Sequence, residues 1–181
     1  MTKSNRTKPF ALLCLLLTPM LFAQAQQTQV QTAPRSNKDT ASPNAIVSAF
    51  FESGSGPAGP RDFDRMRSLF APGARVITIR RAQGVPAIQV SRSIDEYVEE
   101  ARKYLASNGN FETMKKEWVE QYANLGHVFC SFEARKSPNE EVFYRGVGSF
   151  QVLWDGTRWW ILNAYWQGER PGEPLPARYR D

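Results

Sequence analysis

The spacing of apolar residues divides the chain into a helical part followed by a strand-rich part. Apolar positions recur every three or four residues in three segments, beginning after Ser42, near Arg61 and after Ser93, which predicts three helices. Apolar and polar positions alternate in six runs, at 74–81, 86–91, 111–125, 126–136, 142–154 and 157–167. The last four have short links, so an antiparallel meander is expected. The pattern predicts an α+β domain whose helices cover one face of the sheet.

The last of these runs contains RWWILNAYW (158–166), which is apolar on both faces. In a regular strand, Trp159, Ile161, Asn163 and Tyr165 point to one side, and Trp160, Leu162, Ala164 and Trp166 point to the other. A two-residue turn at Asp155-Gly156 would pair Val152 with Trp159 and direct the first set toward the helices. A three-residue loop would shift the pairing by one residue. We expect the two-residue turn.

The two ends of the chain differ in composition from its middle. Three basic residues precede an apolar run at 10–22 and the sequence Ala23-Gln24-Ala25, a pattern typical of a secretory signal peptide over 1–25. Cleavage would make the protein periplasmic or secreted and leave it off the membrane, whereas an uncleaved anchor is the alternative. Segment 26–43 is rich in Gln, Thr, Ser and Pro and is expected to be a disordered tether. A domain over 44–168 and an irregular tail over 169–181 complete the prediction.

Charge and motif content exclude several function classes. The chain has 23 basic and 18 acidic residues, and three of the basic ones lie in the predicted signal peptide, so the remainder is nearly neutral and gives no indication of nucleic-acid binding. Outside the signal peptide, Cys130 is the only cysteine and His127 the only histidine, which argues against a zinc site. The glycines of 54–59 lack the lysine of a phosphate-binding loop. We expect neither metal nor cofactor.

Two stretches carry a family resemblance. LFAPGARV (69–76) leads into the first strand, and RGVGSF (145–150) leads through Asp155-Gly156 to RWWI (158–161). In this order of elements, segment 42–169 resembles the nuclear transport factor 2-like superfamily, which includes ketosteroid isomerases and polyketide cyclases. The resemblance implies a cone-shaped, curved, mostly antiparallel sheet with three helices covering its concave face. It also implies a pocket between sheet and helices, and a homodimer through the outer sheet face, here Trp160, Leu162 and Trp166.

The resemblance and the residues together leave three hypotheses for function. The first is binding of a small apolar or aromatic molecule in the pocket, with Trp118, Arg145, Trp159, Asn163 and Tyr165 as ligand-binding residues. The second is an isomerase, dehydratase, cyclase or hydrolase using His127, Tyr165, Glu117 or another buried glutamate. The third is a non-catalytic dimerisation or protein-interaction module. Ketosteroid isomerase-like members have an acidic base near the position of Thr78, so their mechanism does not transfer directly.

Overall fold

The computed structural model describes residues 38–80 and 88–180. The predicted signal peptide and residues 26–37 of the predicted tether lie outside the described residues, so export stays a prediction. Within the described ranges, none of the helices combines the length and apolarity that crossing a bilayer would require.

Three helices form at the places that the apolar spacing predicts. They are α1 (Pro43–Gly54), α2 (Phe63–Ser68) and α3 (Ile94–Leu105). Ser42 caps α1, because its hydroxyl accepts the Ala45 N–H at 3.1 Å, and Ser93 and Glu96 form the capping box that starts α3. A short 3-10 helix, η1 (Ala177–Tyr179), lies near the C-terminus.

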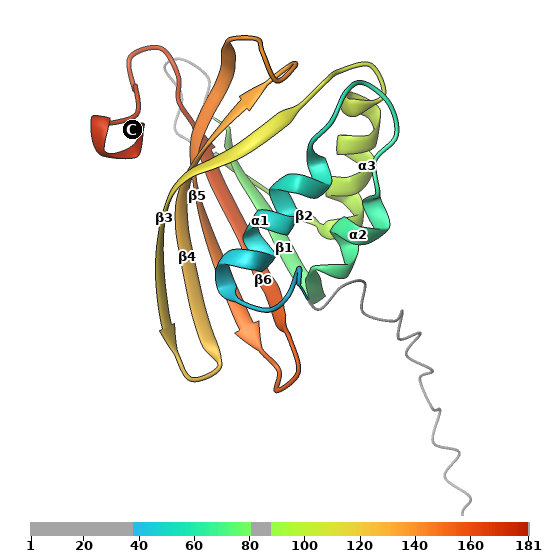
Figure 1. Ribbon diagram of the computed structural model, residues 1–181, viewed down its shortest axis with the longest axis vertical. Helices are drawn as coiled ribbons and strands as arrows, with labels where there is room; N and C mark the ends of the chain where they lie inside the picture. The colour runs from blue at the N-terminus through green and yellow to red at the C-terminus, as the bar shows by residue number, and fades with distance from the viewer. Residues whose placement is uncertain (1–37, 81–87, 181) are drawn as a thin grey trace, which may run out of the picture. The chain divides into compact units, whose positions relative to one another are not determined.

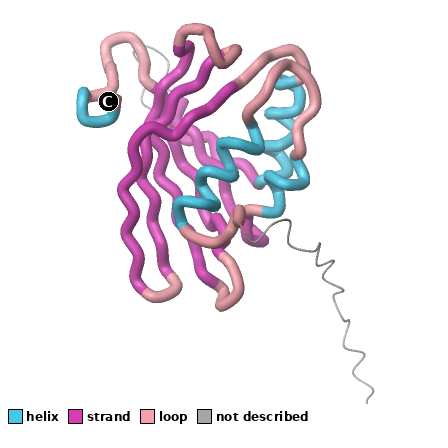
Figure 2. Tube along the Cα trace, viewed as in Figure 1, coloured by secondary structure: helices cyan, strands magenta, loops and turns pink. Residues whose placement is uncertain are grey.

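The described strands form one six-stranded sheet in the order β2-β1-β6-β5-β4-β3. The strands are β1 (Phe70–Arg80), β2 (Ile88–Ser93), β3 (Phe111–Tyr122), β4 (Leu125–Arg135), β5 (Val142–Trp154) and β6 (Trp159–Gly168). All neighbours are antiparallel except β1 and β6, which are parallel. The helices lie on one side of the curved sheet (Figures 1 and 2), which confirms the predicted α+β architecture.

Strand β6 contains a β-bulge that changes which residues face the helices. Val152 pairs with Ile161, but Gln151 pairs with Asn163, so Leu162 is an extra residue without a partner on β5. Trp159 and Ile161 therefore face the helices as expected, but Asn163 and Tyr165 do not. The loop is also longer than the expected two-residue turn, since Trp154 pairs with Trp159.

Beyond the bulge, the side-chain directions of β6 are reversed relative to a regular strand. Ala164 is fully buried, and Trp166 packs on Phe50 of α1 and Tyr97 of α3 with ring centroids 6.1 and 5.7 Å apart. The surface expected from Trp160, Leu162 and Trp166 is thus corrected, because Trp166 lies on the helix side. The homodimer itself stays a prediction.

The core is an aromatic cluster centred on α1. The Phe50 ring contacts five other rings, which belong to α1, β1, α3, β5 and β6: Phe51, Phe70, Tyr97, Phe150 and Trp166. The sheet supplies glycines where these rings approach it, since a Cβ on Gly148 would lie 2.8 Å from the Phe150 ring. Side chains thus fill the centre of the space between α1 and the sheet.

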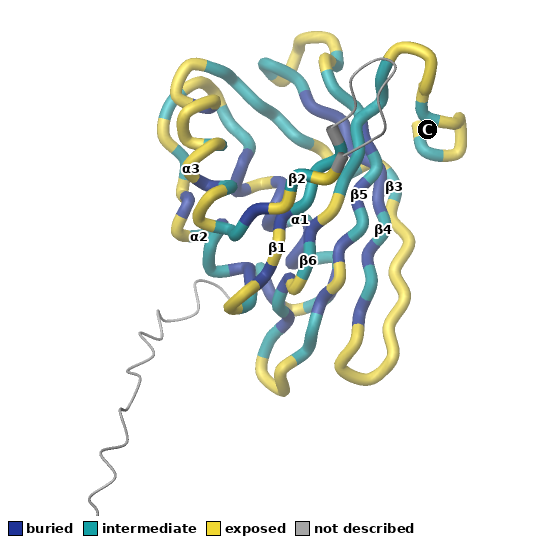
Figure 3. The backbone as a smooth tube through the Cα atoms, turned by 180° about the vertical axis from the view of Figure 1, so that it is seen from behind, coloured by how far each residue is buried: buried dark blue, intermediate teal, exposed yellow. Residues whose placement is uncertain are grey.

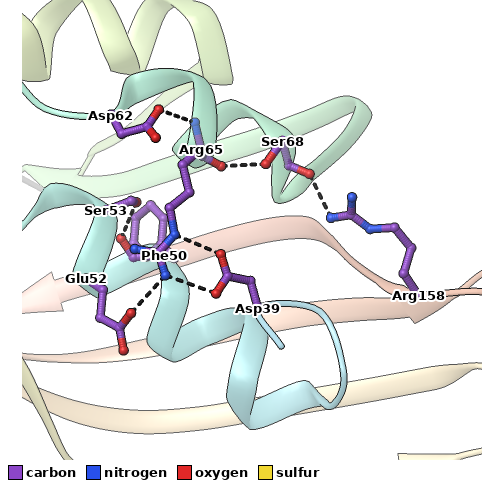
Figure 4. A network of polar contacts seen from close by, with 8 residues as sticks. All are labelled: Asp39, Phe50, Glu52, Ser53, Asp62, Arg65, Ser68 and Arg158. Atoms are coloured by element: carbon purple, nitrogen blue, oxygen red, sulfur yellow. Dashed lines mark hydrogen bonds and ion pairs between the residues drawn. The ribbon is translucent and has the colours of Figure 1, made fainter. Parts of the chain in front are cut away.

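A second contact network ties the N-terminal segment to the helices. Arg65 of α2 donates to Asp39 at 2.8 and 3.1 Å and to Glu52 of α1 at 2.8 Å, and Arg158 donates to the Ser68 carbonyl at 2.7 Å (Figure 4). The hydrogen bonds to these carboxylates raise the pKa of Arg65. Thr40 is buried as well, and its carbonyl accepts the Trp159 N–H. Residues 38–43 therefore belong to the folded domain, which corrects the expected boundary at 44.

The C-terminal segment lies on the face of the sheet away from the helices (Figure 1). Glu169 N–H still bonds to the Arg145 carbonyl at 2.7 Å, after which the chain turns and brings Tyr179 against Trp118 and Phe129. Residues 169–180 of the predicted tail are therefore largely irregular, and they pack against the outer face of the sheet. The second half of β3 remains exposed (Figure 3).

The bulge places Trp166 on the helix side of β6 and leaves Trp160 on the outer side. A pair of substitutions tests this placement. Trp166→Ala should lower the free energy of unfolding by about 3 kcal/mol, because a packed ring leaves a cavity beside Phe50. Trp160→Ala should cost about 1 kcal/mol, since that ring makes one hydrogen bond to Asp155 and one contact with the Arg158 guanidinium. Urea unfolding measures both. Equal losses, or a larger loss at Trp160, would contradict the bulged register.

Candidate functional site

Three ionisable side chains come together on the helix side of the sheet, near the start of β3. Glu112 pairs with Ala134 across β3 and β4, and Ala134 pairs with Tyr144 across β4 and β5. Glu112, Ala134 and Tyr144 therefore form a row across the sheet, with the small Ala134 side chain in the middle. Because directly paired residues point to the same face, the glutamate and the tyrosine flank Ala134, which is itself 1% exposed. Tyr97 of α3 faces this row.

The Glu112 carboxyl lies in apolar surroundings at the end of α1. Its Oε2 atom is close to Gly54, since a Cβ on that glycine would be 3.5 Å from it. Burial raises the pKa of Glu112 to about 7, and a hydrogen bond with the Asn110 side chain opposes the shift. No ion pair joins Glu112 to any residue within 38–80 and 88–180. The carboxyl therefore exists in both protonation states near neutral pH.

The two tyrosines keep their protons under the same conditions. Burial raises the pKa of Tyr97 and of Tyr144, and in each case the negative charge of Glu112 raises it further. The Tyr97 ring meets Trp166 edge-on, and the Tyr144 ring lies against Gly168, where a Cβ would be 2.3 Å from the hydroxyl. Both hydroxyls are available as hydrogen-bond donors.

A buried arginine lies on the same side of the sheet. Arg92 of β2 forms an ion pair with Glu100 of α3 at 2.7 Å and donates to the Thr78 hydroxyl at 3.4 Å. Its positive charge slightly opposes the rise in the pKa of Tyr97. The Thr78 hydroxyl, on β1, thus receives a hydrogen bond from a cation.

The chemistry open to this group, here called the Glu112 site (Tyr97, Glu112, Tyr144 and Trp166), is proton transfer. A carboxyl with a pKa near 7 can both take and return a proton, and two tyrosine hydroxyls can stabilise charge on an oxygen atom. All four residues are partly exposed. Within the described part of the chain, no three His, Cys, Asp or Glu side chains are grouped as metal ligands would be.

The side chains expected to bind a ligand are distributed differently from the prediction. Trp159 is 4% exposed and packs on Trp154 in the core. Four others, Trp118, Arg145, Asn163 and Tyr165, lie on the outer face, and for the last two the cause is the bulge at Leu162.

Two of these outer-face residues have defined surroundings. Arg145 pairs with Glu133 at 3.1 Å and lines a hollow of about 450 Å³ beside the C-terminal segment. The Asn163 Oδ1 atom is buried and accepts no hydrogen bond from the described residues. Ligand binding by the five expected residues stays a prediction.

The residues expected to be catalytic do not converge either. His127 lies on the outer face and exchanges a hydrogen bond with Ser149 at 2.9 Å. Tyr165 is on that face too, whereas Glu117 faces the helices and accepts a hydrogen bond from Asn44 of α1. The glutamate that lies beside Tyr97 and Tyr144 on the helix side is Glu112, which the sequence analysis does not single out. Its signal was available in the alternation of β3, which places Glu112 and Met114 on the apolar side.

Comparisons with known proteins support the fold. No family model matches the sequence, and no curated protein does either. Among solved structures, the chain is similar to a candidate dehydratase of the nuclear transport factor 2-like family from Streptomyces avermitilis, with a TM-score of 0.53 and 15% identity over 77% of this chain and 97% of that one.

Two further structures agree with this result. A nuclear transport factor 2-like protein of unknown function from Pseudomonas putida has a TM-score of 0.54 and 10% identity, covering 74% of this chain and 89% of its own. A candidate ketosteroid isomerase from Parabacteroides distasonis has a TM-score of 0.50 and 10% identity, covering 76% and 95%. The domain thus has the cone fold of nuclear transport factor 2-like proteins, as the sequence resemblance predicted.

The raised pKa of Glu112 links folding to pH. The folded-state pKa is about 7 against a usual value of 4.5, so between these values the folded state binds a proton that the unfolded state has lost. The contribution of Glu112 to the free energy of unfolding is therefore fully present below about pH 4.5, and it is lost as the pH rises through 7. The free energy of unfolding of Glu112→Gln should therefore be roughly 1–3 kcal/mol higher than that of the parent protein between pH 5 and pH 8.

Chemical denaturation at a series of pH values measures this difference. Glu140→Gln, in the exposed turn after β4, removes one surface carboxylate as a control. If the free energies of unfolding of Glu112→Gln and of the parent protein changed with pH in parallel, the raised pKa of Glu112 would be refuted.

Proposed function

We propose that the domain binds a small, largely apolar molecule at the Glu112 site and catalyses the transfer of a proton between two atoms of this molecule. The molecule carries a carbonyl or hydroxyl oxygen. The observation that carries this proposal is the grouping of one carboxyl with two tyrosines on the helix side of the sheet, beside Ala134. Apolar and aromatic side chains surround this polar group, which suits a ligand with few polar atoms of its own.

The proposed chemistry assigns one role to each polar residue. The Glu112 carboxylate takes a proton from a carbon next to a carbonyl group, and the electron pair of the broken C–H bond moves to the carbonyl oxygen. The hydroxyl of Tyr97 or Tyr144 donates a hydrogen bond to that oxygen as its charge increases. Protonated Glu112 then returns the proton to another carbon, which gives an isomerisation, or to a leaving hydroxyl, which gives a dehydration.

The surroundings support a compact ligand rather than a large one. Phe50, Phe132 and Phe150 are all nearly fully buried and occupy the centre of the space between α1 and the sheet. Glu112 and Trp166, by contrast, are partly exposed residues. The names of the candidate dehydratase and the candidate ketosteroid isomerase agree with the proposed class of reaction. In this proposal the base is Glu112, on β3.

Exchange of an acidic C–H proton with solvent tests the proposal without the natural substrate. In D₂O, the protein should accelerate deuterium incorporation next to the carbonyl of 2-tetralone above the rate in buffer, with mass spectrometry as the readout. Glu112→Gln should lose about 10²-fold or more of the acceleration, and Tyr97→Phe or Tyr144→Phe about 10- to 100-fold. Because the base must be ionised, the rate should rise as the pH increases through about 7.

Tyr122→Phe is the matched control, because this tyrosine is 85% exposed at the end of β3. Its exchange rate should equal that of the parent protein. Exchange no faster than in buffer, or full activity of Glu112→Gln, would refute proton transfer at this site.

A further inference from the structure

We infer that the outer face of the sheet holds a second binding site, under the C-terminal segment, that takes a small organic cation with an apolar body. The site is a hollow of about 320 Å³ between β4, β5 and β6 on one side and residues 168–179 on the other. Ligand sites for small molecules begin at about this volume. The sheet separates it from the Glu112 site, so the two proposals are independent.

Three aromatic rings form part of its wall. They are Phe129 of β4, Tyr165 of β6 and Tyr179 of η1, and the centroids of Phe129 and Tyr179 are 5.9 Å apart. Trp118 supports Tyr179 from the side at 5.6 Å. Aromatic faces carry partial negative charge and attract cations, above all those that are weakly hydrated. Val147, Leu175 and two prolines complete an apolar lining suited to the body of the ligand.

The charged groups of the lining have one sign. Glu169 and Glu173 line the hollow, and among the described residues no lysine or arginine does. Glu173 pairs with Arg170, but Glu169 makes no ion pair with any residue of the described ranges and accepts one hydrogen bond, from the Leu175 N–H at 3.3 Å.

Two arginines near the hollow already have partners. Arg145 pairs with Glu133, and Arg178 lies over one face of the Tyr179 ring and donates to its hydroxyl at 2.8 Å. A cation would therefore find the Glu169 carboxylate and the Phe129 and Tyr165 rings, whereas an anion would find no positively charged side chain among the described lining residues. The neighbouring hollow of about 450 Å³ includes Arg145 and Arg170 and lacks this bias.

A charge series with one aromatic body tests the inference. The protein purified from its host is titrated with 2-phenylethylammonium, 2-phenylethanol and 3-phenylpropionate, and amide chemical shifts of residues 165–176 are followed by NMR. We expect the ammonium ion to bind at least about fivefold more tightly than the alcohol, and the carboxylate to bind least. Glu169→Gln should abolish the preference while its side-chain carbonyl retains the bond to Leu175. Tyr165→Leu should weaken cation binding by about fivefold.

Two controls separate this site from general charge effects and from the Glu112 site. Glu140→Gln makes the same change in net charge on the exposed turn after β4 and should leave the preference intact. Glu112→Gln should do so too, so failure of the proton-transfer proposal would not affect this one. Equal binding of cation and alcohol, an unchanged preference in Glu169→Gln, or no shifts at millimolar ligand would overturn the inference.

Discussion

The packing of Phe50 against the sheet is the interaction on which the other features depend. One ring on α1 contacts rings from β1, α3, β5 and β6, so the helix position, the sheet curvature and the place of α3 are set together. The same packing fills the middle of the space where the fold could otherwise hold a ligand. The partly exposed ionisable residues lie at the end of that space, where Glu112 is next to Tyr97 and Tyr144.

The bulge at Leu162 is what allows one strand to serve both faces of the sheet. Before it, Trp159 and Ile161 face the helices, and after it Ala164 and Trp166 do. Trp166 completes the contacts of Phe50 and forms one wall of the Glu112 site. The same extra residue directs Tyr165 outward, where it lines the second hollow together with residues of the C-terminal segment. A single inserted residue thereby contributes to two separate candidate sites.

The sequence predicted the architecture well, because the helices and strands depend on local patterns. The Ser42 cap, the Ser93 capping box and the four strands from 111 onward all appear in the structure at the expected places. The direction of Asn163 and Tyr165 could not be read in the same way. Alternation assumes a regular strand, and nothing in ILNAY shows that Leu162 would lack a partner.

The candidate site was harder to predict than the fold, because it depends on residues distant in the sequence. Glu112, Ala134 and Tyr144 come together only through the pairing of three strands, and Tyr97 reads in the sequence as one apolar position of a helix. His127 attracted attention as the only histidine, yet its partner is Ser149 on the opposite face. Rarity of a residue type identified a chemical group but not its surroundings.

The most direct test is a crystal structure of the protein with 2-naphthol, whose hydroxyl and flat rings imitate an enol intermediate. The account predicts that the rings contact Trp166 and that the oxygen lies within hydrogen-bond distance of Tyr97 or Tyr144, with the Glu112 carboxyl beside the ligand. Density for the ligand only on the outer face, or none in saturated crystals, would contradict the assignment of the Glu112 site.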